Sequence, residues 1–125
     1  MPDFSVLKKR RSFVRLTKGA FCVATKTLVL QAMESEAENL SGKPRIGYTT
    51  TKKIGKAHTR NRCRRRLRAA AALFFCDYAM PNFDYVLVAR YTTEKAKFAT
   101  ICDDLVYALK KAKMNFVGEK GNQPC

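Results

Sequence analysis

The residues with the clearest chemical potential are arginines, and they gather in one short stretch of the chain. Six of the nine residues from Arg60 to Arg68 are arginine. Like charges three or four positions apart on a helix repel each other by roughly a few tenths of a kcal/mol per pair. No acidic residue occurs between Asn39 and Cys76 to offset this repulsion. The stretch therefore predicts a partner outside the chain that supplies negative charge.

Phosphate is the partner that this chemistry favours, since a planar guanidinium can donate two parallel hydrogen bonds and stays charged at biological pH. On a helix, an apolar stripe would run along one side, and the arginines would occupy the outward arc. A solvated charged face is the plain alternative, but such faces normally carry interspersed acids. The stripe comprises Cys63, Leu67, Ala70, Ala71 and Phe74. The candidate RNA-binding residues are Lys52, Lys53, Lys56, Arg60, Asn61, Arg62, Arg64, Arg65, Arg66 and Arg68.

Groups that could cut RNA are sparse. A protein nuclease needs a paired general acid and base, or clustered carboxylates that hold metal. His58 is the only histidine, and Asp103 and Asp104 are neighbours whose side chains diverge on a helix and are expected to be solvated. The five cysteines show no CxxC spacing, so we expect reduced thiols, four in the core and Cys125 on a loose tail. We expect no catalytic residue, no protein metal site and no activity of the protein alone.

Composition bounds the class of protein. The chain has 125 residues, 46% of them hydrophobic, and a net charge of +15. This length suits one compact domain, and the charge indicates a polyanion, either nucleic acid or an anionic membrane. No signal peptide or membrane-spanning stretch is evident, so a cytoplasmic protein is expected. The apolar stripe of the arginine helix has no tryptophan and suits packing against a sheet better than lying on a membrane.

The elements that must position these residues alternate between helices and strands. The pattern predicts a helix over 7–19 that Ser12 caps, strands within 20–33, an acidic loop over 34–44 and a strand over 45–53. A turn at 54–57 leads into the arginine helix, which runs to about Tyr78. A central strand follows at 83–91, and a last helix begins near Thr93, with Phe98 heading its apolar face. We expect one α+β domain over 1–125, ordered from about 7 to 112, with a frayed tail over 113–125.

The stretch "KKIGKAHTRNRCRRRLR" (52–68) resembles the signature of the protein component of bacterial ribonuclease P. That family has a lysine pair, a Gly-x-Ala turn and an Arg-Asn-Arg motif before a basic helix. The order of the surrounding elements is also similar over roughly residues 7–112. The chain departs from the pattern at His58, at Cys63 and in "RAAAA" (68–72), which replaces the usual acid and aromatic.

The resemblance implies an α/β sandwich in the order αβββαβα, with a central mixed sheet and a left-handed βαβ crossover through the basic helix. It also implies that an RNA subunit is the catalyst and removes the 5′ leader of precursor tRNA. Mg²⁺ would be bound mainly by that RNA and the substrate, and no organic cofactor would be needed. The expected partners are ribonuclease P RNA and precursor tRNA, with a protein that is monomeric outside the holoenzyme.

The resemblance assigns two surfaces. The candidate RNA-binding residues from Lys52 to Arg68 would face the catalytic RNA. A cleft between the first helix and the sheet would hold the single-stranded leader, with Phe13 as an aromatic contact and Leu16 where many members carry a second aromatic. A structural RNA-binding protein, such as a small ribosomal protein, remains the alternative from another class.

Overall fold

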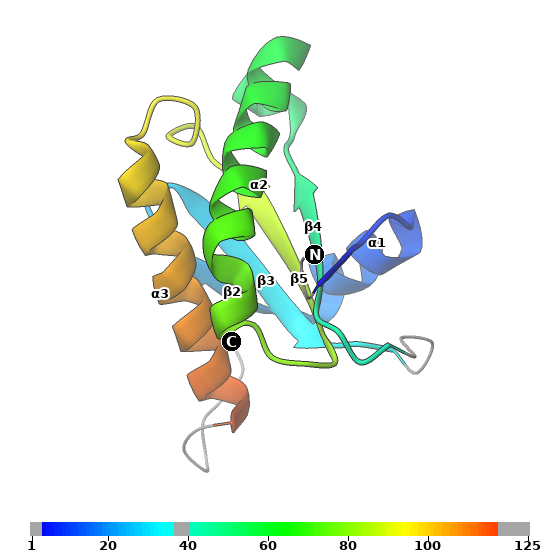
Figure 1. The fold of residues 1–125 in the computed structure, drawn as a ribbon. Helices are drawn as coiled ribbons and strands as arrows, with labels where there is room; N and C mark the ends of the chain where they lie inside the picture. The colour runs from blue at the N-terminus through cyan, green and yellow to red at the C-terminus, as the bar shows by residue number, and fades with distance from the viewer. Residues whose placement is uncertain (1–3, 37–40, 118–125) are drawn as a thin grey trace.

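One five-stranded mixed sheet organises the molecule (Figure 1). The computed structural model describes residues 4–36 and 41–117, so part of the predicted acidic loop and the end of the tail lie outside the described residues. The strands are β1 (Ser5–Val6), β2 (Phe21–Ala24), β3 (Leu28–Glu34), β4 (Arg45–Thr49) and β5 (Phe83–Ala89), in the sheet order β1-β4-β5-β3-β2. The helices are α1 (Arg10–Gly19), α2 (Ala57–Tyr78) and α3 (Phe98–Val117), and a 3-10 turn spans Lys52–Ile54.

The central strand, β5, pairs parallel with β4 and antiparallel with β3. In register, Tyr85 of β5 lies opposite Ile46 of β4, and Leu87 lies opposite Leu30 of β3. Successive side chains of a strand point to opposite faces, so Tyr85 and Leu87 join the main core under α2 and α3, while Val86 packs against α1. The strand is therefore covered on both faces, as its continuous apolar sequence predicts.

The connection from β4 to β5 has the unusual hand that the family resemblance implies. Strands β4 and β5 run in the same direction. In the view of Figure 1, α2 lies in front of the sheet and connects β4 to β5, which lies to the left of β4. A crossover of this geometry is left-handed, whereas about 98% of such connections are right-handed. The predicted α+β fold and element order are confirmed, with the short strand β1 added before α1.

Two predicted helix starts are wrong. The first helix begins at Arg10 after an N-cap at Lys9, and Ser12 lies inside it, buried, rather than capping it. The last helix begins at Phe98 and not near Thr93. Thr93 is fully buried, and its hydroxyl donates to the carbonyl of Thr27 and accepts from the amide of Arg90. Such side-chain bonds to the backbone compete with a helix and hold the chain in a turn.

Several core predictions also need correction. Phe75, not Phe74, is the fully buried aromatic of α2, and its ring makes edge-on contacts with Phe4 and Tyr85. Helix α3 continues to Val117, beyond the expected ordered limit at 112. Of the cysteines, Cys63 and Cys102 are buried, Cys22 and Cys76 are exposed, and Cys125 lies outside the described residues.

Candidate nucleic-acid interface

The approach to the arginine helix is a sharp turn that only glycine makes comfortably. After β4, the 3-10 turn ends at Gly55, whose φ is 150°. A Cβ at this position would also lie 3.3 Å from the side chain of Thr59 in the first turns of α2. Glycine tolerates this region of φ because it has no Cβ. The turn carries the exposed side chains of Lys52, Lys53 and Lys56 to the beginning of α2.

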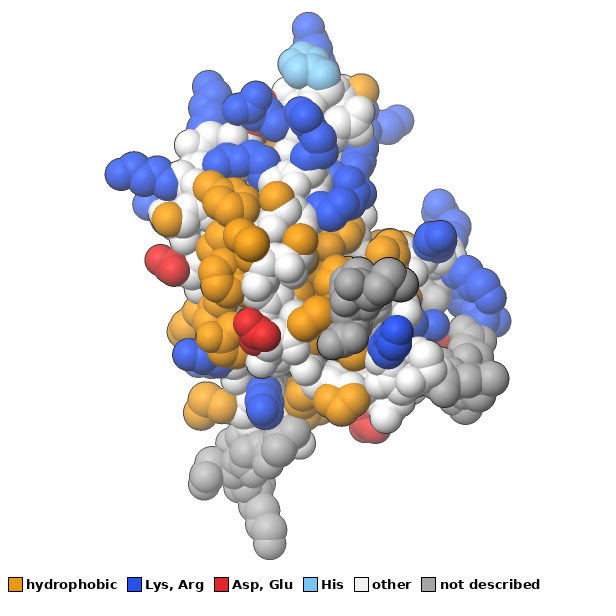
Figure 2. Space-filling model, viewed as in Figure 1, with side chains coloured by type: hydrophobic (Ala, Val, Ile, Leu, Met, Phe, Trp, Pro, Cys, Tyr) orange, Lys and Arg blue, Asp and Glu red, His pale blue; other side chains and the backbone are white. Residues whose placement is uncertain are grey.

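Helix α2 has the two faces that its sequence predicts. Its buried side chains are Cys63, Leu67, Ala70, Ala71 and Phe75, which pack on the sheet and α3. Its polar residues are exposed at Asn61, Arg62, Arg65 and Arg68 and half-buried at Arg60, Arg64 and Arg66. Figure 2 shows basic side chains gathered over the N-terminal half of α2 and apolar ones over the remainder of α2 and α3. One group of positive charges therefore lies at the α2 end of the molecule, and a second lies at the right of the view in Figure 2.

Two of the outward arginines are held by neighbours. The guanidinium of Arg64 donates to the side-chain oxygen of Asn61, one helical turn earlier. Arg68 lies over the ring of Tyr48 on β4, with 5.2 Å between its guanidinium carbon and the ring centre. Burial raises the pKa of Tyr48 to about 12, although Arg68 offsets part of the rise, so this ring stays neutral. These contacts reduce the freedom that the two side chains would lose on binding phosphate.

Beside these residues lies an open pocket of about 520 Å³, lined by His58, Asn61, Arg64, Arg65 and Arg68. No α2 arginine pairs with a carboxylate in the part of the chain that the structure describes. The pocket wall offers several hydrogen-bond donors and no acidic side chain, which suits phosphate groups.

Arg66 differs from the other predicted RNA-binding residues. One terminal nitrogen donates to the carbonyls of Thr93 and Glu94, at 2.7 and 2.6 Å, and the other donates to Ala96, at 2.5 Å. Because its donors are engaged with backbone, Arg66 fixes the 90–97 turn against α2. The structure thus gives Arg66 a positioning role that its sequence position did not reveal.

On the other face of the sheet, the two predicted leader-contact residues also differ from each other, one being accessible and the other structural. Phe13 is half-buried, and its ring packs so closely on Gly47 of β4 that a Cβ there would lie 2.5 Å from the ring. Leu16 is fully buried with Leu7 and Val86. A side chain without exposed surface cannot stack on a base, so only Phe13 of the predicted pair is available for contact. Leu16 instead supports α1 on the sheet.

A buried ion cluster near α1 was not predicted. Asp84 is fully buried at the start of β5 and accepts two hydrogen bonds from Arg45, each 2.7 Å long, and one of 2.9 Å from Arg15. Burial opposes ionisation of this carboxyl, but the bonds from Arg45, Ser35 and Arg15 outweigh it and lower the pKa of Asp84 below its usual value. The only sequence signal is one acidic residue in an otherwise apolar strand.

The other titratable side chains of residues 4–36 and 41–117 form no catalytic arrangement. Asp103 is exposed, whereas Asp104, also predicted to be solvated, accepts bonds of 3.0 and 2.6 Å from the amide and hydroxyl of Thr27. Among the described residues, no group of three or more His, Cys, Asp or Glu side chains could hold a metal ion. Within the same residues, no helix has the length and apolar character needed to cross a membrane.

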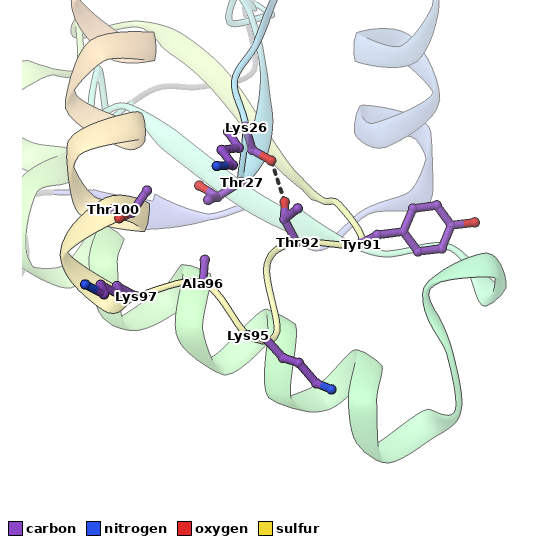
Figure 3. A pocket seen from close by; sticks show the side chains of 8 residues that line it. All are labelled: Lys26, Thr27, Tyr91, Thr92, Lys95, Ala96, Lys97 and Thr100. Atoms are coloured by element: carbon purple, nitrogen blue, oxygen red, sulfur yellow. Dashed lines mark hydrogen bonds between the residues drawn. The ribbon is translucent and has the colours of Figure 1, made fainter.

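A further pocket, of about 500 Å³, lies between the 90–97 turn and the loop that joins β2 and β3 (Figure 3). The hydroxyl of Thr92 donates to the carbonyl of Lys26 and ties this turn to the loop between β2 and β3. The lining residues are Lys26, Thr27, Tyr91, Thr92, Lys95, Ala96, Lys97 and Thr100. With three lysines and no carboxylate, this pocket favours anions and lacks an acid–base pair.

Comparisons with known proteins agree with this geometry. The family model described as Ribonuclease P matches residues 1–113. The ribonuclease P protein component of Ruegeria pomeroyi is 40% identical over 108 residues, covering 86% of this chain and 85% of that protein. The protein component of Paramagnetospirillum magneticum is 38% identical over 106 residues, covering 84% and 80%. The solved structure of the Staphylococcus aureus RNase P protein has a TM-score of 0.70 at 26% identity, over 86% of this chain and 94% of that one.

Proposed function

The chain belongs to the ribonuclease P protein family and is a subunit of that tRNA-processing endoribonuclease, and we propose that it binds two RNAs through two separate surfaces. The N-terminal half of α2, with its preceding lysines, binds the RNA subunit. The surface between α1 and the sheet binds the single-stranded 5′ leader of precursor tRNA. Catalysis belongs to the RNA subunit.

The observation that carries the first part of the proposal is the row of outward arginines on α2 without acidic partners among the described residues. Each guanidinium that contacts a phosphate releases counterions from the RNA, which favours binding at low salt. The pocket bounded by His58 and Arg68 gives this row a concave seat for a phosphate backbone.

The second surface has the features that a leader of variable sequence requires. Phe13 is half-buried, as are Met33 of β3 and Val88 of β5, which pack against the same small cluster. Every base has a flat aromatic face, so stacking on a ring tolerates any sequence and contributes about 1–3 kcal/mol per base. Phe13 is therefore the residue to which we assign the leader contact.

The chemistry of α2 also bears on Mg²⁺. Arginine and lysine are not ligands for this ion, which prefers carboxylate, carbonyl and phosphate oxygens. We therefore assign Mg²⁺ to the RNA subunit and its substrate, where it supplies the charge needed for phosphodiester cleavage. The protein contributes fixed positive charge between two polyanions, which lowers their mutual repulsion and so the Mg²⁺ concentration needed for cleavage.

The test is cleavage of precursor tRNA by the ribonuclease P RNA of Ruegeria pomeroyi at low Mg²⁺ and near-physiological salt. Three reactions are compared: RNA alone, protein alone and the two together. We expect cleavage to a mature 5′ end only in the mixture. If the protein binds the RNA but leaves cleavage unchanged, it acts as a structural RNA-binding protein and the proposal is wrong.

A further inference from the structure

An exposed aromatic side chain stands beside the arginine row. The sequence places Phe98 at the head of the apolar face of α3, but its side chain is 37% exposed, while Ile101 and Leu105 of the same face are fully buried. Phe98 borders an open pocket of about 360 Å³ together with Arg62, Arg65, Arg66 and Ala69 of α2. One wall of this pocket is therefore aromatic, and the opposite wall carries guanidinium groups.

The position of Phe98 is fixed by the bonds of Arg66. That side chain holds the carbonyls of Thr93, Glu94 and Ala96 and so anchors the turn that leads into α3. Phe98 comes two residues after the last of these carbonyls. Ala69 of α2 also lines the pocket and contributes only a methyl group. The backbone that carries Phe98 is thus anchored by the fold before any ligand arrives.

Positive charge continues into the neighbouring pockets. A neighbouring pocket of about 440 Å³ is lined by Arg62, Arg66, Glu94, Lys95 and Ala96. Beyond it, Lys95 and Lys97 border the pocket shown in Figure 3. A chain of phosphates can therefore run from α2 across the 94–98 turn with basic side chains along its path. Among the described residues that line these three pockets, Glu94 is the one acidic group.

We propose that Phe98 is a stacking platform for an unpaired base of the RNA that α2 binds, with Arg62 and Arg65 contacting the phosphates that flank this base. The inference rests on the proposed function and adds a base contact to a surface otherwise made of phosphate contacts. RNA is commonly recognised in this way, by splaying a single-stranded base onto an aromatic ring while arginines hold its backbone.

Exposed apolar residues elsewhere on the same helices supply a matched comparison. Tyr107 of α3 is 53% exposed and Leu73 of α2 is 60% exposed. Both lie further along their helices, and neither lines an arginine-bordered pocket among those described here. The proposal therefore predicts an effect for Phe98 that exposure alone does not produce.

The experiment titrates Ruegeria pomeroyi ribonuclease P RNA with the full chain and its variants at several KCl concentrations. Phe98→Ala is expected to weaken binding about five- to 20-fold, the lower part of the range for one lost stacking contact. The dependence of log affinity on log salt should keep its slope, because no phosphate contact is removed. Phe98→Tyr should bind like the parent, Phe98→Leu should be weakened like Phe98→Ala, and Tyr107→Ala should be unaffected.

Two outcomes overturn the inference while leaving the proposed function intact. One is parental binding by Phe98→Ala when Arg64→Ala/Arg68→Ala binds weakly. The other is parental binding by Phe98→Leu, which would make the contact apolar rather than stacking. Parental binding by the double arginine variant as well would instead overturn the proposed function. Thermal melts of each variant identify any that misfold, and Phe98→Leu keeps the test decisive because it preserves most of the apolar volume.

Discussion

Arginine serves opposite purposes on the two sides of this sheet. Beside α1, Arg15 and Arg45 share the buried carboxylate of Asp84 at distances of 2.7 to 2.9 Å. On α2, the arginines other than Arg66 face outward, and among the described residues no α2 arginine forms an ion pair with a carboxylate. The first group is paired with a carboxylate inside the fold, and the second is left with unbalanced charge. The same side chain is therefore structural in one region and available for binding in the other.

Structural arginines can be distinguished from arginines that are available for binding by the partners of their side chains. A paired arginine stabilises the folded chain, and its loss is felt in the free protein. An unpaired row destabilises the free protein slightly and acts only when a partner arrives. Arg66 belongs to the first kind although it lies within the second row, because its donors are satisfied by backbone carbonyls. The hydrogen bonds of an arginine, rather than its place in a basic run, indicate its role.

The largest effect is expected where the internal pairing is broken. Asp84→Asn removes the buried carboxylate that Arg15 and Arg45 share, and should lower the free energy of unfolding by about 3 kcal/mol. This value is at the lower end for buried pairs, since the Arg15 and Arg45 side chains keep 24% and 16% of their exposure. Urea denaturation at neutral pH measures it. Asp103→Asn, at an exposed position of α3, is the control and should change stability by less than about 0.5 kcal/mol.

The decrease in the free energy of unfolding at acid pH should depend on the carboxyl of Asp84. The folded-state pKa of Asp84 is lowered, so its contribution is present above the unfolded pKa of roughly 4 and is lost as pH falls through the folded pKa. The parent should lose stability over this acid range, and Asp84→Asn should lose less. Parallel pH profiles for the two proteins would contradict the internal pairing.

The second effect concerns the unpaired row. Replacing Arg64 and Arg68 with Ala should weaken binding of the RNA subunit about tenfold or more and reduce the salt slope by roughly 0.7–0.9 per lost phosphate contact. The free energy of unfolding of the free protein should change little. The contacts of Arg64 with Asn61 and of Arg68 with Tyr48 are lost, but two repelling pairs at i,i+4 spacing, Arg60/Arg64 and Arg64/Arg68, are removed as well. Filter binding over a range of KCl concentrations gives both quantities. Lys113→Ala, at an exposed position near the end of α3, controls for loss of charge alone. An unchanged salt slope in the double variant would show that Arg64 and Arg68 face solvent in the complex.

The third effect tests whether the paired side of the sheet takes part in substrate binding. Phe13→Ala should weaken binding of leader-bearing precursor tRNA to the holoenzyme about five- to 20-fold. Mature tRNA, which lacks the leader, should bind as before, and the RNA subunit should still assemble with the protein. Val14→Ala is the control, since Val14 is the next residue of α1 and is exposed. Equal losses for precursor and mature tRNA would argue against a leader contact at Phe13.

The smallest expected effect measures how far unpaired charge on α2 destabilises the free protein. Arg65 is exposed on α2 and has Arg62 and Arg68 three positions away on either side. Arg65→Glu replaces two repulsions with two attractions, so the free protein should become more stable by about a few tenths of a kcal/mol. Binding of the RNA subunit should weaken at the same time. Precise urea titrations can resolve the gain, and a loss of stability would mean that Arg65 has a structural contact.

Sequence reasoning succeeded where a pattern repeats along one element. The period of α2 identified its buried and outward faces, and the apolar run of β5 placed it at the centre of the sheet. Strand β1 has only two residues and leaves no periodic signal. The bonds of Arg66 reach across 27 to 30 positions, and those of Asp84 join three other segments, so no local window contains them. The left-handed crossover came from the family resemblance alone.

The crossover also sets an order of events during synthesis. Strands β4 and β5 pair side by side, yet all of α2 lies between them in the chain. Their pairing waits until β5 has left the ribosome, and contacts between distant segments form slowly. The arginine helix therefore emerges before the sheet that covers its apolar stripe is complete. The repulsion among its arginines is greatest during that interval. An RNA that is already present would therefore help the growing chain to fold, before the finished protein and the RNA form their complex.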